Sequence, residues 1–134
     1  MVTQNYNIEQ EILFVDNSGR LDFESMKKYF SSLKDYSYKA SVLYIIEDAR
    51  KANVKFNSEH LLSLSKVLQK VSEKYEYVYH AVLLEERKNI AYAMMINQGI
   101  GVENYTLDVF SDESIALEWI RTQRYYYNEK TNNF

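Results

Sequence analysis

Two stretches of the chain are apolar over consecutive positions instead of alternating with polar residues. The first is Val42–Asp48, which reads Val-Leu-Tyr-Ile-Ile-Glu-Asp, and the second covers residues 77–85. A strand that is buried on both faces has this pattern, because both rows of its side chains must leave water. We therefore expect two strands of a parallel sheet here. Val42–Asp48 should lie in the interior of that sheet, with its carboxyl end pointing at a loop.

Two other stretches have the period of a helix, with apolar residues three or four positions apart. They predict helices from residue 23 to about 36, and from residue 57 or 58 to about 75. Asp22 is a good N-cap for the first helix, because its carboxylate accepts hydrogen bonds from free backbone N–H groups. Asn57 or Ser58 is expected to cap the second.

The second half of the chain predicts two more helices on either side of one more strand. Residues 86–97 predict a helix, which the glycines at positions 99 and 101 should stop. Residues 105–110 then predict a strand. Ser111 should cap the final helix, and the acidic residues that follow it suit the positive end of a helix dipole.

At the amino end, Tyr6-Asn7-Ile8 alternates, and residues 12–16 form another short apolar run. The polar residues between them predict a turn, so the two should form a β-hairpin with the first strand at the sheet edge. The element order is then β-β-α-β-α-β-α-β-α. Strands that alternate with helices predict parallel pairing with right-handed crossovers. The expected fold class is α/β: a mostly parallel five-stranded sheet with an N-terminal β-hairpin and four main helices.

Composition narrows the class of protein. The chain has 134 residues, 46% of them hydrophobic, which suffices for one domain with one core. We place this domain at residues 1–127, with fraying at the tyrosines 125–127 and a flexible tail at residues 128–134. The net charge of −3 argues against a nucleic-acid partner, whose binding surface is normally basic. Because there is no cysteine, disulfides, thiol catalysis and cysteine metal sites are excluded.

The sequence predicts neither a membrane span nor a signal peptide. No apolar run approaches the roughly 20 residues that a membrane span requires. The first residues, Met-Val-Thr-Gln-Asn, lack the basic and apolar regions of a signal peptide. We therefore expect a cytoplasmic protein with no membrane span.

Charged residues gather where the two central strands should end. Asp48 and Arg50 follow the first strand, and Glu85, Glu86 and Arg87 follow the second. The carboxyl ends of parallel strands meet at one sheet edge, where open α/β sheets place their ligands. One interpretation is a polar ligand site that includes Asp48 and Arg50. The other, which we favour, is an ion pair that fixes the loop, because pairs of this kind are common at the rims of sheets.

The sequence shows no catalytic constellation. His60 should lie in the first turn of a helix and His80 within a strand, and neither has the spacing of a Ser-His-Asp or His-Glu-His group. The acidic residues are scattered, without the spacing of metal ligands. We therefore expect structural or surface roles for both histidines, and no catalytic residue, cofactor or metal site.

The best clue to function lies in the helix predicted at residues 86–97, which is apolar at the seven consecutive positions 90–96. Seven positions cover a helix all round, and a helix that is apolar on every side is normally buried on every side. With Ile90, Ala93 and Met94 facing the sheet, three residues need another cover: Tyr92, Met95 and Ile96. A neighbouring helix, the tyrosine-rich tail, a second copy of the chain or an apolar ligand would supply it. We expect a homodimer or ligand contact here.

Three segments of the chain together are similar to one known group of proteins. They are Gly19-Arg20-Leu21-Asp22, Glu47-Asp48-Ala49-Arg50, and Val109-Phe110-Ser111-Asp112-Glu113 with the following Ala116-Leu117-Glu118-Trp119-Ile120. With them, roughly residues 6–121 resemble the SpoIIAA-like family, which comprises STAS domains and related small proteins of the CRAL-TRIO type. The resemblance implies a SpoIIAA-like fold and, as in most such proteins, no enzymatic activity.

The resemblance also implies possible roles. Some members are phospho-switched regulators of sigma-factor antagonists, and others bind small or lipidic ligands. In the switch subgroup an Asp-Ser-Ser/Thr-Gly turn follows the central strand. Here Asp48 is followed by Ala-Arg-Lys-Ala-Asn-Val-Lys-Phe-Asn before Ser58. We therefore expect no regulatory phosphoserine after this strand, and a capping role for Ser58.

Three hypotheses for function follow. The first is a non-catalytic binding or regulatory domain, whose partner is another protein or a small apolar ligand. The second is a lipid or small-molecule carrier, which an enclosed pocket above roughly 300 Å³ would favour. The third, an enzyme that uses Asp48, Arg50 and Glu85, has the least support, because no activated nucleophile is visible. The candidate contact residues are Tyr92, Met95, Ile96, Asp48 and Arg50.

Overall fold

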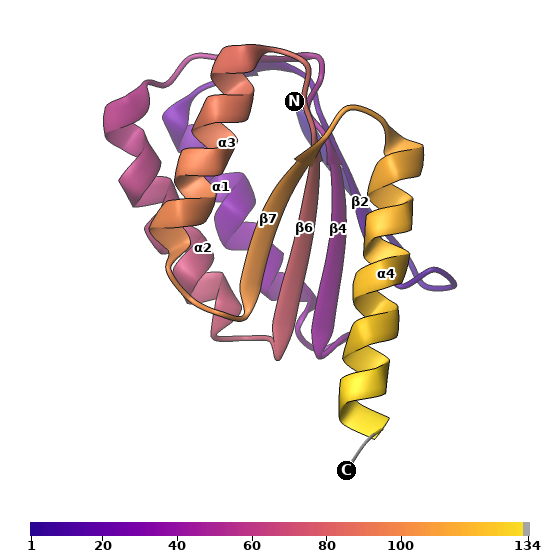
Figure 1. Cartoon of the computed structure of the whole chain (residues 1–134). Helices are drawn as coiled ribbons and strands as arrows, with labels where there is room; N and C mark the ends of the chain where they lie inside the picture. Colours follow the sequence, from indigo (N-terminus) through magenta and orange to yellow (C-terminus); the bar gives the residue numbers. More distant parts are fainter. Residues whose placement is uncertain (133–134) are drawn as a thin grey trace.

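The computed structural model describes residues 1–132, and its main feature is a five-stranded sheet with helices on both faces (Figure 1). The strand order is β1-β2-β4-β6-β7. β1 runs antiparallel to β2, and all other neighbours are parallel. The predicted fold class is therefore confirmed. The strands of this sheet are β1 (Val2–Asn7), β2 (Ile12–Asn17), β4 (Val42–Asp48), β6 (Tyr77–Leu83) and β7 (Tyr105–Phe110).

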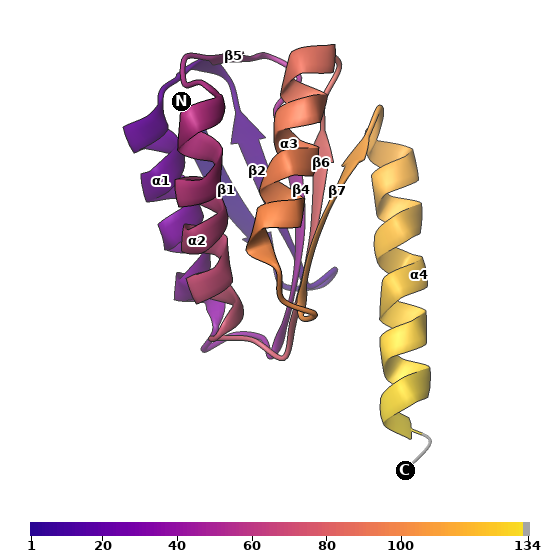
Figure 2. The same ribbon diagram turned by 60° about the vertical axis from the view of Figure 1, so that its left-hand side comes forward.

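Three of the four main helices cover one face of the sheet, and α4 covers the other (Figures 1 and 2). Each face has its own apolar core, and the core under α1, α2 and α3 is the larger. Two short 3₁₀ helices adjoin the main ones: η1 follows α1, and η2 precedes α2. The helices are α1 (Phe23–Ser32), η1 (Leu33–Tyr36), η2 (Ser58–His60), α2 (Leu61–Ser72), α3 (Arg87–Ile100) and α4 (Glu113–Asn132).

β4 is the central strand of the sheet, as predicted. It pairs with β2 on one side and with β6 on the other, and five of its seven residues are buried. Leu43 and Ile45 belong to the core on the α1–α3 face, whereas Tyr44 and Ile46 belong to the core under α4. The continuous apolar run arises because each face of the strand packs against a core of its own.

The sequence does not predict a second, two-stranded sheet that the structure contains. β3 (Gly19–Leu21) and β5 (Ala52–Val54) pair in parallel, after the carboxyl ends of β2 and β4. Gly19 adopts a φ of +77°, which glycine tolerates without steric cost. Each strand has three residues and buries one of them. So short an element leaves no periodic pattern in the sequence.

Side-chain caps explain where α1 and α4 begin. The carboxylate of Asp22 accepts a hydrogen bond from the backbone N of Ser25 at 2.8 Å, so the predicted cap of α1 is confirmed. In α4 the cap is Asp112, whose Oδ1 accepts from the backbone N of Ile115 at 2.9 Å. The prediction of Ser111 is therefore wrong by one residue. A carboxylate also interacts more favourably than a hydroxyl with the positive end of the helix dipole.

α3 extends to Ile100, beyond its predicted end, because Gly99 lies inside the helix. Gly101 follows with a φ of +63° and ends the helix in the left-handed conformation. A side chain at position 99 would collide with Ser65 of α2, so glycine allows these two helices to pack closely. Because the two helices lie so close, Oγ of Ser65 donates a hydrogen bond to the carbonyl oxygen of Ile96 at 2.8 Å.

α4 continues through the residues that were expected to fray. The tyrosines at 125–127 are helical, and so are residues 128–132 of the predicted tail, while residues 133 and 134 lie outside the described part of the chain. The domain boundary at residue 127 stays a prediction. Although α4 has 20 residues, no helix within residues 1–132 is long and apolar enough to cross a membrane.

Candidate functional site

The carboxyl end of β4 carries an ion pair between Asp48 and Arg50. Nε and Nη2 of Arg50 each donate to one carboxylate oxygen of Asp48, both at 2.9 Å, and the backbone N of Arg50 donates to Oδ1 at 3.2 Å. The hydrogen bonds from Arg50 hold the pKa of Asp48 below its ordinary value. Both side chains are partly exposed, so solvent screening keeps the contribution to stability small. That the pair serves only to fix the loop stays a prediction.

The predicted contact residues do not form one site. Successive side chains of a strand point to opposite faces of the sheet. Glu47 accordingly contacts Tyr29 of α1, whereas Asp48 lines a shallow hollow on the other face together with Glu113 of α4. Tyr92 packs against the core on the α1–α3 side. The rim pair and the α3 residues are thus separated by the sheet.

α3 turns a different side toward the core than its sequence predicts. Met94, expected to face the sheet, is 58% exposed, and Ile96, expected to point away, is 3% exposed. Seven consecutive apolar positions have no polar side to orient the helix. The close packing of Gly99 against Ser65 instead fixes its rotation. The buried residues of α3 are Asn89, Ala93, Ile96 and Ile100.

Much of α3 is covered by other parts of the chain. α2 and β7 pack against it. Tyr92 stacks on Phe56 from the loop after β5, with ring centroids 6.0 Å apart, and Nζ of Lys88 lies 5.4 Å from the centre of the Tyr92 ring. Met94 and Met95 are the large apolar residues of this helix that stay exposed, at 58% and 48%. Of the three residues expected to need another cover, Met95 is exposed, Tyr92 is half-buried and Ile96 is buried. The exposed side of α3 is instead the adjacent pair Met94 and Met95.

A small apolar cavity lies between α1, α3, the β3–β5 sheet and the main sheet. Its volume is about 40 Å³, and Tyr92 and Ile96 contribute to a lining that is mainly apolar. Pockets for drug-sized ligands typically have 300 Å³ or more. This cavity is therefore too small to support the hypothesis of a carrier with an enclosed pocket.

The core on the α1–α3 side contains a buried polar cluster that sequence reasoning misses. Glu47 and His80 are almost fully buried, and Glu47 Oε1 lies 2.8 Å from His80 Nε2. Tyr29 donates its hydroxyl to the same oxygen at 2.8 Å, and Asn17 Nδ2 donates to Oε2 at 3.1 Å. On the far side of the imidazole, Nδ1 lies 2.7 Å from the hydroxyl of Tyr105. The carboxylate thus has three polar partners.

This cluster keeps one carboxylate ionised inside the core. Burial raises the pKa of Glu47, but the hydrogen bond and charge of His80, with the hydrogen bonds of Asn17 and Tyr29, more than offset it, so the pKa lies below its ordinary value. Burial and the nearby carboxylate raise the pKa of Tyr29 and Tyr105, which stay neutral. Among residues 1–132, no three acidic or histidine side chains are placed to hold a metal ion.

The second histidine takes part in a helix cap. Oδ1 of Asn57 accepts from the backbone N of Glu59 at 3.2 Å, and Nδ1 of His60 accepts from the backbone N of Asn57 at 3.4 Å. The imidazole also stacks on Phe23, with ring centroids 4.4 Å apart. Of the two cap candidates, Asn57 is therefore correct, and the capping role expected of Ser58 is wrong.

Replacing Asn57 with alanine should lower the free energy of unfolding by about 0.5–2 kcal/mol, because the helix start loses its side-chain acceptor. The neighbouring Ser58→Ala variant is the matched control, and its stability should stay within about 0.5 kcal/mol of the wild type. Urea unfolding followed by circular dichroism measures both. Equal losses in the two variants would contradict the assignment of the cap.

Comparison with known proteins identifies the fold. No protein-family model and no curated protein sequence matches the chain. A solved structure of an uncharacterized protein of the DUF3478 family from Shewanella loihica PV-4, with a SpoIIAA-like fold, matches with a TM-score of 0.58 and 14% identity, over 89% of this chain and 91% of that one. The phosphorylated form of SpoIIAA, a Bacillus cell fate determinant, matches with a TM-score of 0.48 and 13% identity, over 90% and 99% of the chains.

The chain therefore has a SpoIIAA-like fold, and the fold expected from the resemblance is confirmed. Identity of 14% shows the fold alone. What the protein binds has to be inferred from its own side chains, because one fold supports many functions.

Proposed function

We propose that the protein is a non-catalytic binding domain whose partner is another protein, contacted by the outward side of α3. The observation that carries this proposal is the exposure of the adjacent Met94 and Met95, on a helix whose opposite side is held in the core. The flexible, polarizable side chain of methionine adapts to the shape of a partner. Methionine is also enriched at protein interfaces relative to the rest of the surface.

The contact surface comprises Met94 and Met95, with Tyr92 at its edge. The ring of Tyr92 is held between Phe56 and Lys88, so it offers a rigid aromatic border to the two flexible methionines. Ile96 lies beneath this surface and supports it from the core. Asp48, the last residue of β4, points to the other face of the sheet, so we assign the Asp48–Arg50 pair the role of holding the loop that follows β4.

The arrangement of the two histidines supports a non-catalytic role. His80 and its carboxylate partner Glu47 are 0% and 1% exposed, so a substrate does not reach them. His60 accepts a hydrogen bond within a helix cap and stacks on Phe23. Each imidazole is thus engaged in a contact that holds the fold together.

Met95→Glu tests the proposal, because replacing one of the two methionines with a charged side chain should prevent an apolar contact. Ile115→Glu is a matched control: Ile115 is 49% exposed against 48% for Met95, and it lies on α4, on the other side of the sheet. Light scattering gives the oligomeric state of each variant, and circular dichroism shows that it is folded. If the wild type is monomeric, partners captured from extracts of its own cells are compared among the three proteins.

We expect Met95→Glu to stay folded and to lose the partner, whether that partner is a second copy of the chain or a different protein. Ile115→Glu should keep it. The proposal fails if both variants keep the same partners as the wild type, or if both lose them equally.

A further inference from the structure

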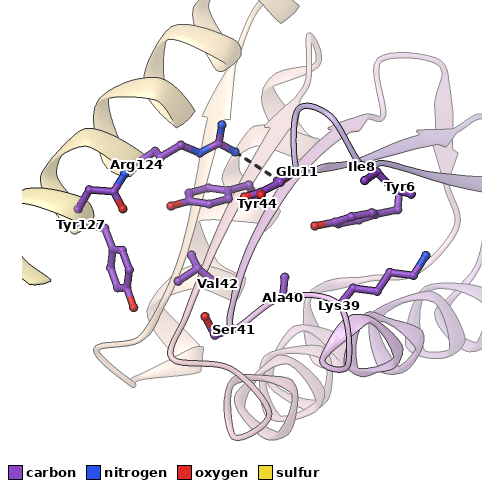
Figure 3. Close-up of a pocket in the computed structure, with 11 residues that line it drawn as sticks. Tyr6, Ile8, Glu11, Lys39, Ala40, Ser41, Val42, Tyr44, Arg124 and Tyr127 are labelled. Atoms are coloured by element: carbon purple, nitrogen blue, oxygen red, sulfur yellow. Dashed lines mark hydrogen bonds between the residues drawn. The ribbon is translucent and has the colours of Figure 1, made fainter.

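A hollow of about 570 Å³ lies at the opposite end of the molecule from the carboxyl rim, at the amino end of β4 (Figure 3). It is an open groove, bordered by β1 and the turn after it, the segment before β4 and the second half of α4. Its volume falls in the range of small-molecule sites. Three tyrosine rings line this groove: Tyr6, Tyr44 and Tyr127.

Arg124 of α4 forms one side of the groove. Its Nη2 donates to the carbonyl oxygens of Gln10 at 2.8 Å and Glu11 at 3.4 Å, and its guanidinium carbon lies 4.5 Å from the centre of the Tyr44 ring. Its Nε is buried and has no hydrogen-bond partner within residues 1–132. A guanidinium has five N–H donors, so Arg124 retains hydrogen-bonding capacity that the described chain does not use.

The charges around the groove favour an anion. Lys39 lies on the side of the groove opposite Arg124, with Nζ 5.4 Å from the centre of the Tyr6 ring (Figure 3). Its side chain is exposed. Glu11 is the acidic residue of the lining. Lys39 and Arg124 therefore outnumber the single carboxylate, on a chain whose net charge is −3. The lining itself thus carries one more positive than negative charge, and the carboxylate of Glu76, next to the groove, accepts the hydroxyl hydrogen of Tyr127.

The tyrosines do not cancel this charge, because they remain protonated at neutral pH. Burial raises the pKa of Tyr6 and of Tyr44. The hydrogen bond that Tyr127 donates to Glu76 raises the pKa of Tyr127 to about 12. All three side chains are therefore neutral. Tyr44 is 5% exposed and its ring packs against Tyr79 and Arg124, so the groove meets mainly the edges of the rings.

We propose that this groove binds a small organic anion with a flat aromatic body. The body would lie against the edges of the Tyr6, Tyr44 and Tyr127 rings, since edge contacts between aromatic groups are favourable. Lys39 and Arg124 would hold the anionic group, because charge-assisted hydrogen bonds are the stronger ones. This site is separate from the α3 surface, so the two proposals stand or fall independently.

Two probes of the same shape test the proposal: 2-naphthoate, which is anionic, and 2-naphthol, which is neutral at pH 7. Titration calorimetry with the full chain gives the affinities, and ¹⁵N NMR shift changes locate the site. We expect 2-naphthoate to bind at least about tenfold more tightly than 2-naphthol, with the largest shift changes in the residues that line the groove.

Lys39→Gln is the decisive variant, because Lys39 is exposed and its loss leaves the packing of α4 intact. It should weaken 2-naphthoate binding about threefold or more and leave 2-naphthol unchanged. Lys27→Gln is the matched control, since Nζ of Lys27 lies 5.9 Å from the Phe23 ring on α1, away from the groove. Equal affinities for the two probes, shift changes outside the groove, no binding at millimolar concentration, or equal effects of the two lysine variants would each overturn the proposal.

Discussion

Replacing Glu47 with alanine should lower the free energy of unfolding by about 3–5 kcal/mol, the largest loss that we expect from any polar substitution in this chain. The carboxylate is 1% exposed and binds His80, Tyr29 and Asn17. Without it, two donors and an imidazole nitrogen stay buried with no partner, and each such group carries a desolvation penalty. Urea unfolding followed by the fluorescence of Trp119 measures the loss.

Asp48→Ala is the control for this result, because Asp48 is the next residue of the same strand but is partly exposed at the rim. Its salt bridge with Arg50 should contribute about 1 kcal/mol or less. Similar losses in the two variants would contradict the burial of the Glu47 cluster that the structure shows. A Glu47→Gln variant, which keeps the shape but removes the charge, should fall between the alanine variant and the wild type.

The same carboxylate makes stability depend on pH in a defined direction. The pKa of Glu47 is lowered in the folded chain relative to its ordinary value of 4.5. Between the folded and unfolded pKa values the unfolded chain binds more protons, so stability rises with pH in that window. The contribution of Glu47 is therefore complete above about pH 4.5 and is lost as the pH falls through the folded-state pKa. The difference in the free energy of unfolding between the wild type and Glu47→Gln separates the contribution of Glu47 from those of the other carboxylates. This difference should shrink below pH 4.5.

The arrangement of the sheet could be predicted because it depends on signals that are local in sequence. The apolar run Val42–Asp48 needs burial on both faces, and only an interior strand provides it. Capping residues such as Asp22 marked helix starts to within a residue or two. β3 and β5 could not be predicted from the sequence. Each strand has three residues and buries one side chain, which is too few for a detectable period.

The polar cluster and the groove could not be predicted, because each joins residues that are far apart in the chain. Glu47 was visible as a carboxylate near the end of a strand, but its burial depends on His80, 33 residues away, and on Asn17, 30 residues away. Arg124 meets the β1–β2 turn across more than 110 residues. Such contacts form when complete helices and strands pack against one another, so the spacing of residues within one segment does not predict them.

Replacing Ile96 with alanine should lower the free energy of unfolding by about 2–5 kcal/mol, because it removes a 3% exposed side chain and leaves a cavity in the larger core. Ile96 already borders the small cavity beneath α3, so the loss of its methyl groups would enlarge an existing void. The surroundings have little freedom to close it. The carbonyl of Ile96 is tied to Ser65, and Gly99 is in close contact with the same serine.

Met95→Ala, one position earlier on α3, is the matched control and should change stability by no more than about 0.5 kcal/mol, since that side chain is 48% exposed. Urea unfolding of both variants compares the two sides of the helix directly. A large loss for Met95→Ala with a small one for Ile96→Ala would mean that α3 is rotated relative to its orientation in the structure, with Met95 in the core and Ile96 outside it. It would also move the partner contact from the methionine pair to Ile96. The predicted order of the two losses therefore tests both the rotation of α3 and the surface on which the proposed function depends.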